Sequence, residues 1–163
     1  MPEAGAPPLM EALAARKDAI VSAWLARTLE TYPERTSRLL AKEPDPFRNP
    51  VGHALKEALP ALFDELLGAM DAGRLAPLLD GIVRIRAVQD FTPSQAVAFV
   101  FLLKQAIREE GGGEGLAAVD GRIDEMALLA FDLFMRCREQ MFTIKADEAR
   151  RRTSLLERMQ ERS

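Results

Sequence analysis

The polar residues Arg86, Gln89 and Asp90 stand shortly before AVAFVFLL, a run of eight residues without a polar side chain. On a helical wheel of about 100° per residue, all three fall on the same side as the apolar stripe of their helix. A charge on a buried face costs several kcal/mol unless it is paired. Arg86 and Asp90 are four residues apart, which is the spacing of an ion pair on one helix face. We therefore predict an inward-facing pair of Arg86 and Asp90, with Gln89 beside it.

Two further residues, Thr92 and Gln95, complete this candidate site. The sequence TPSQ fits a capping box, in which the Thr92 side chain bonds the Gln95 amide and the Gln95 side chain returns to the Thr92 amide. One interpretation is a polar lock that fixes the corner between two helices. The other is a small pocket in which Arg86 meets an anionic signal molecule. We favour the lock, because inward charges are commonly structural ion pairs.

The single histidine and the single cysteine do not indicate a metal or redox centre. His53 falls opposite the apolar stripe of its helix and faces water, whereas a haem or metal ligand projects into a pocket. Cys137 lies on an apolar stripe and is interpreted as a small buried hydrophobe. No nucleophile, base and orienting group stand at a recognisable spacing. We predict no metal, no cofactor and no enzymatic activity.

The elements that position these residues are all helical, because proline and glycine divide the chain into helical segments without strand alternation. Asn49 and Pro50 form a favourable helix start. The run AVAFVFLL predicts a central helix buried on all sides, as in a globin-like bundle. The expected fold is an all-α, globin-like bundle of about five main helices with an extended C-terminal helix. These helices are predicted over residues 8–32, 50–66, 76–89, 93–110 and 116 to near the C-terminus, with a shorter piece around Leu39 and Leu40.

We predict a helical domain over residues 1–145 and a helical extension over residues 146–163. The apolar residues of the extension are few but keep helical spacing, which suits contact with a helix of a partner protein. These residues are Ala146, Ala149, Thr153 and Leu156.

A homodimer is predicted as well, because the first and last helices carry more apolar residues than one stripe needs. The extra residues are Val21, Leu25, Leu133 and Phe134.

Length and charge limit the class of protein. A chain of 163 residues forms one ordinary domain, and its single cysteine excludes an intrachain disulfide and fits a reducing compartment. A net charge of −3 gives no electrostatic reason to bind nucleic acid. The N-terminus lacks the pattern of a secretory signal, and AVAFVFLL is shorter than the roughly 20 residues of a membrane span. We expect a cytoplasmic protein that binds no nucleic acid and spans no membrane.

Three stretches resemble a known family: AWLARTLETYP, FRNPVGHALKEALPALFDELL and LDGIVRIRAVQDFTPSQAVAFVFLLKQAIRE. They resemble the N-terminal domain of RsbR-type stressosome proteins, the co-antagonist sensor domain, over roughly residues 10–145. The resemblance implies a globin-like, all-helical domain that carries no haem and commonly dimerises. In stressosome proteins its last helix leads into a STAS domain, whose phosphorylation relays stress to a kinase and sigma-factor pathway.

Because the sequence ends at Ser163, we expect a stand-alone sensor or adaptor without a STAS domain. It would signal through dimerisation and through helix contacts with a separate chain. The alternative is a module that binds a small anion or an apolar ligand among the central helices.

Overall fold

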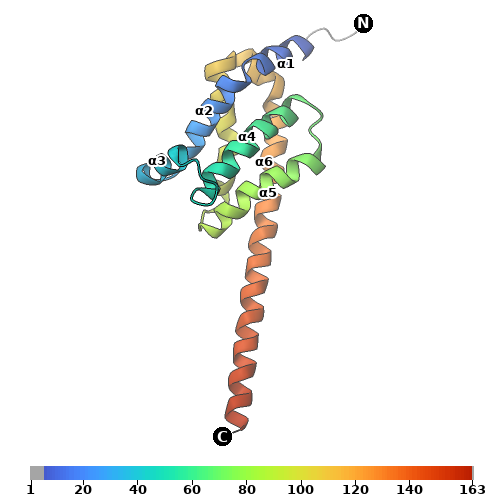
Figure 1. The fold of residues 1–163 in the computed structure, drawn as a ribbon. Coiled ribbons are helices and arrows are strands. Elements are labelled where there is room, and N and C mark those ends of the chain that lie inside the picture. Colours follow the sequence, from blue (N-terminus) through green and yellow to red (C-terminus); the bar gives the residue numbers. More distant parts are fainter. Residues whose placement is uncertain (1–5, 163) are drawn as a thin grey trace.

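The computed structural model describes residues 6–162, which form helices joined by short connections and contain no strand (Figure 1). The predicted all-α class is confirmed for these residues. The helices are α1 (Ala6–Ala15), α2 (Lys17–Leu29), α3 (Glu34–Lys42), α4 (Pro50–Leu67), α5 (Ala72–Val88) and α6 (Pro93–Glu161).

The predicted division into helices is wrong at one place and confirmed at another. The first predicted helix is two helices, because Arg16 leaves the helical backbone region with φ −104° and ψ 14°. The predicted break at residues 111–113 is confirmed, because α6 leaves the helical region at Gly112 with φ 77° and ψ 170°. A positive φ suits glycine, which has no Cβ to clash. The chain reverses here, so we distinguish a first limb (residues 93–111) and a second limb (residues 113–161) of α6 (Figure 1).

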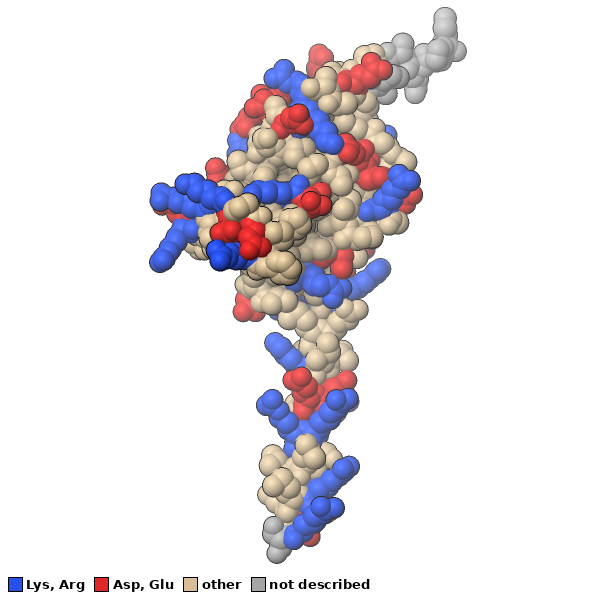
Figure 2. All heavy atoms as spheres, viewed as in Figure 1, with Lys and Arg blue, Asp and Glu red and all other residues tan. Residues whose placement is uncertain are grey.

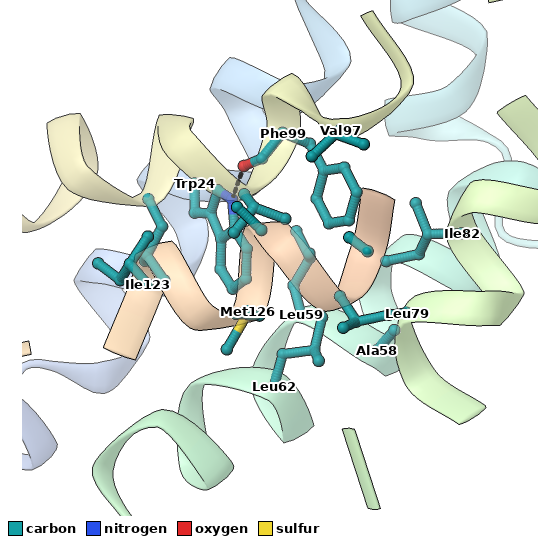
Figure 3. Close-up of a cluster of buried hydrophobic side chains, with 14 of the residues drawn as sticks. Trp24, Ala58, Leu59, Leu62, Leu79, Ile82, Val97, Phe99, Ile123 and Met126 are labelled. Atoms are coloured by element: carbon teal, nitrogen blue, oxygen red, sulfur yellow. Dashed lines mark hydrogen bonds between the residues drawn. The ribbon is translucent and has the colours of Figure 1, made fainter. Parts of the chain in front are cut away.

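The core is organised around Trp24 of α2 and Phe99 of the first limb (Figure 3). The indole Nε1 of Trp24 donates a hydrogen bond of 2.6 Å to the Phe99 carbonyl, and the two rings stack with centroids 6.5 Å apart. A buried indole N–H needs such an acceptor. The apolar faces of α4 and α5 pack around this centre. Their buried apolar residues are Leu55, Ala58, Leu59, Leu62, Phe63, Leu66, Leu75, Leu79, Ile82, Val83 and Ala87.

The first limb is not buried on all sides, which corrects the prediction for residues 96–103. Phe99, Val100 and Leu103 are buried, but 47% of Phe101 is exposed and Ala98 is only partly covered. The limb contacts α2 through Phe99, α5 through Gln95 and the second limb through Lys104, and Phe101 lies on a side that remains open. An unbroken apolar run contains no polar residue to mark that open side.

The predicted Asn49 cap fixes the start of α4. Its Oδ1 accepts a 2.9 Å hydrogen bond from the Gly52 amide. Its Nδ2 donates to the carbonyls of Leu40 (2.8 Å) and Glu43 (3.1 Å), which ties the end of α3 to α4. Gly52 lies under this network, and a Cβ there would be 2.5 Å from the Leu40 carbonyl oxygen and 2.3 Å from Asn49 Nδ2.

The second limb continues past the domain as a projecting helix (Figure 1). Its last buried residue is Cys137, and no residue from Arg138 to Arg162 is buried. We call residues 138–161 the tail. The predicted boundary at residue 145 falls within it.

Gly52→Ala is expected to lower the free energy of unfolding by about 1–3 kcal/mol, because the new methyl group displaces the Asn49 network. Gly81→Ala in α5 is the control, since no atom other than those of its chain neighbours and its own helix backbone lies within 4 Å of its Cβ position. Alanine is the better helix former, so this variant gains about 0.5–1 kcal/mol. Urea unfolding measures both. Equal stability of the two variants would show that the α3–α4 connection accommodates the new methyl group without a loss of free energy.

Removing residues 146–163 is expected to leave a folded domain, since the deleted segment contributes no buried side chain in the described part. The free energy of unfolding changes by less than about 0.5 kcal/mol. Circular dichroism with thermal unfolding tests this. If the truncated chain is unfolded, the tail is part of the core and the proposed boundary at residue 145 is wrong.

Candidate functional site

Arg86 occupies the last turn of α5 and is fully buried, with 0% of its surface exposed. Its Nη1 donates to the Gln95 carbonyl at 3.0 Å, and its Nη2 donates to Thr31 Oγ1 at 3.2 Å. Its Nε has no hydrogen-bond partner. Among residues 6–162, no carboxylate pairs with this guanidinium within 4.0 Å. The buried charge is therefore compensated by something other than an acid.

Three aromatic rings surround the guanidinium. Its Cζ lies 4.9 Å from the ring centroid of Phe91, 5.3 Å from that of Phe99 and 5.5 Å from that of Tyr32. Aromatic faces attract a cation, and the attraction is larger when the pair is desolvated. Burial lowers the pKa of Arg86 and raises the pKa of Tyr32, because both charged forms lose hydration.

The predicted pair of Arg86 and Asp90 does not form. Helix α5 ends at Val88, and Asp90 adopts a positive φ of 60°, so the helical wheel no longer gives its direction. Its side chain is exposed. Gln89 is also exposed, and its Oε1 accepts a 3.2 Å hydrogen bond from the Tyr32 hydroxyl. Gln89 thus meets Arg86 only through Tyr32.

The predicted capping box is present. Thr92 Oγ1 accepts from the Gln95 amide at 3.3 Å, and Gln95 Oε1 accepts from the Thr92 amide at 3.0 Å. The box fixes the first turn of α6, whose Gln95 carbonyl receives Arg86. Because Arg86 has no exposed surface, an anion reaches it only after the rings move. This arrangement favours the lock over the pocket.

Sequence reasoning missed the partners of Arg86. Thr31, Tyr32, Phe91 and Phe99 come from different parts of the chain, and only the fold brings them together. Tyr32 precedes Pro33 at a helix end, a position that the sequence marks as a boundary and not as part of a site.

A second candidate site is an apolar groove of about 930 Å³ between the two limbs, here called the α6 groove. Phe101, Leu128 and Phe131 line it and are 47%, 68% and 43% exposed. Asp124 is the charged residue that lines the groove, and its Oδ1 accepts a 2.7 Å hydrogen bond from Lys104 Nζ. The remaining lining residues are Pro93, Ser94, Val97, Ala98 and Ala127.

The residues predicted to form a dimer surface lie elsewhere. Phe134 is fully buried. The other three residues, Val21, Leu25 and Leu133, are partly buried and pack against the core. The sequence shows an excess of apolar residues on the last helix, but the side on which they are exposed depends on how the two limbs pack.

An exposed stripe continues from the α6 groove along the second limb. Successive members are seven residues apart in two series. The first series is Leu128, Met135, Phe142, Ala149 and Leu156, and the second is Phe131, Arg138, Lys145, Arg152 and Met159; all of them are exposed. Of the seam predicted at Ala146, Ala149, Thr153 and Leu156, Ala149 and Leu156 belong to this exposed stripe.

A cleft of about 640 Å³ lies where the stripe leaves the domain. Asp90 lines it from the α5–α6 corner, and Arg138, Phe142 and Lys145 line it from the tail. Asp90, which lies four residues after Arg86, therefore lines the same cleft as the first residues of the tail.

His53 is exposed and Cys137 is buried, as the sequence predicts. In the described part of the chain, no three His, Cys, Asp or Glu residues are grouped so as to hold a metal ion. Nor does any helix between residues 6 and 162 combine the length and the apolar character that crossing a membrane requires.

Arg86→Ala is expected to lower the free energy of unfolding by about 2–5 kcal/mol, because it leaves a cavity between three rings. The substitution leaves no carboxylate without a partner, so the loss of stability arises from lost packing and lost hydrogen bonds. Arg86→Met keeps most of the volume and is expected to lose less. Urea unfolding compares them. An unchanged midpoint for Arg86→Ala would contradict the lock, and equal losses would assign the stability to the hydrogen bonds alone.

Tyr32 is the only tyrosine, so ultraviolet absorbance of phenolate reports its titration directly. The expected midpoint in the folded protein lies above 10.0, because burial raises the pKa of Tyr32. A pKa raised by folding stabilises the protein below pH 10.0, and that contribution is lost as pH rises through the folded-state pKa. Arg86→Met removes a charge that lowers the pKa, so its midpoint is higher still. A midpoint at or below 10.0 in the native protein would contradict the burial of Tyr32.

Comparison with known proteins adds a family. A family model described as the RsbT co-antagonist protein rsbRD N-terminal domain matches residues 18–151. The match includes Arg86 with the residues around it (the Arg86 corner), the α6 groove and the first part of the tail. Neither the search of curated proteins nor that of solved structures returned a match. The chain belongs to the family of RsbT co-antagonist rsbRD N-terminal domains.

Proposed function

We propose that this protein is a non-enzymatic signalling sensor or adaptor of the stressosome type. In this proposal it has globin-like packing without haem, dimerises through the α6 groove and contacts a partner protein through the tail. Membership in the rsbRD N-terminal domain family supports the signalling role. The exposed apolar groove is the observation that carries the proposed mode of action.

The α6 groove suits an isologous contact. Phe101, Leu128 and Phe131 project at its rim, and the small side chains of Ala98 and Ala127 form a hollow beside them. A two-fold axis through the groove lets the rim of each copy enter the hollow of the other. An exposed patch this apolar typically marks an interaction surface.

The Arg86 corner supports a route from the domain to the tail. Arg86 joins the end of α2, the end of α5 and the first turn of α6. Asp90 of the same corner lines the cleft at the root of the tail. A ligand or contact that shifts the corner therefore changes the surroundings of Arg138 and Lys145.

A second candidate function is binding of an apolar ligand, because the volume and the largely apolar lining of the α6 groove suit one. Native mass spectrometry of the purified protein separates the two functions. A bound small molecule on a monomer favours the ligand-binding module, and a ligand-free dimer favours the adaptor.

Sedimentation velocity at micromolar concentration is expected to show a dimer of the 18.1 kDa chain. Leu128→Glu places a charge in the groove and is expected to raise the dimer dissociation constant at least about tenfold. Leu39→Glu is the matched control, because Leu39 is also exposed but lies on α3, outside the groove. A wild-type monomer, or equal weakening by both substitutions, would refute the proposed interface.

A further inference from the structure

The exposed stripe has the repeat of a coiled-coil seam. Its two series alternate by three and four residues, as the core positions of a heptad do. A straight α-helix drifts by about 20° per heptad against such a repeat. A partner helix that follows the stripe must therefore wind around the tail in a left-handed supercoil.

The two series differ in chemistry. The first is apolar throughout, whereas the second changes from Phe131 to three consecutive basic residues, Arg138, Lys145 and Arg152. Among the residues that the structure describes, no carboxylate lies within 4.0 Å of these three cations. Figure 2 shows basic and acidic side chains projecting from the tail, with uncharged segments between them.

A second copy of the tail is a poor occupant of this seam. In a parallel pair the same residues of the two chains face each other, so three successive layers oppose like charges. The residues that follow Lys145 and Arg152 and flank the seam on that side are Ala146 and Thr153, which carry no charge; the other flank carries one acid, Glu148. Only Arg138 is followed by an acid, Glu139. Neither series contains a carboxylate, so an antiparallel pair also leaves the cations without acidic partners in the core.

We propose that the tail binds an acidic amphipathic helix of a partner protein. Apolar side chains of that helix pack on the apolar series beyond the groove, which consists of Met135, Phe142, Ala149 and Leu156. Carboxylates at the alternate core positions pair with the three basic residues, and pairing inside a partly desolvated seam is stronger than at an open surface. The proposal rests on the adaptor function and names the class of its partner.

In a dimer closed at the α6 groove, the basic layers hold the two tails apart. Each tail then presents its own seam, and one partner helix binds per chain. The dimer contact and the partner contact use different parts of the stripe, since Leu128 and Phe131 line the groove and the basic residues lie beyond it. The two contacts are therefore separately testable.

The experiment measures binding of two labelled synthetic helices to the full chain by fluorescence anisotropy. One peptide has four heptads with Leu at one core position and Glu at the other, and the matched peptide has Lys in place of Glu. The Glu peptide is expected to bind at least about tenfold tighter, and its affinity falls when salt is raised from about 50 to 200 mM. The triple substitution Arg138→Gln, Lys145→Gln and Arg152→Gln removes the preference while leaving the domain folded, since all three side chains are exposed.

Equal binding of the two peptides, or binding of neither, overturns the proposal. So does an unchanged preference in the triple variant, which circular dichroism verifies as folded. Single-stranded DNA is the competitor that tests whether the tail binds any polyanion. If it displaces the Glu peptide at equal charge concentration, the seam does not recognise a helix. Leu128→Glu keeps the preference even when it breaks the dimer, so loss of the dimer and loss of partner binding are distinguished.

Discussion

A buried guanidinium without a carboxylate sets the geometry of this domain. Arg86 is held by a carbonyl of α6, a hydroxyl beyond the end of α2 and three aromatic rings. Moving a cation out of water costs several kcal/mol, so these groups must stay close around it. Its place in the last turn of α5 adds favourable interaction with the free carbonyls of that helix end. The three helices that meet at the corner therefore have little freedom to move independently.

The features that the sequence predicts well are local. The Asn49 cap, the capping box of Thr92 and Gln95, and the inward faces of α4 and α5 follow from neighbours within one or two helical turns. The burial of Arg86 follows from the same spacing. Asp90 and Gln89 depart from it because α5 ends at Val88, and a helical wheel holds only while the helix continues.

Contacts between distant segments escaped prediction for a different reason. The aromatic environment of Arg86 combines residues from the end of α2, the α5–α6 connection and α6, and nothing in the spacing of any one of them indicates the others. In the run AVAFVFLL, Phe99 stacks on Trp24 and covers Arg86, whereas Phe101 lies in the α6 groove. Two identical side chains, two positions apart, thus serve the interior and the surface, and hydrophobicity alone does not tell them apart.

The uninterrupted helix beyond Cys137 makes the molecule a lever. The 24 residues from Arg138 to Glu161 extend for about 36 Å at about 1.5 Å per residue. A tilt of about 5° at the root displaces the far end by about 3 Å over that length. Changes in side-chain packing near Asp90 that are too small to alter the core are thereby magnified into displacements as large as a side chain. Stiffness of the helix, and not movement of the domain, determines how faithfully such a change is transmitted.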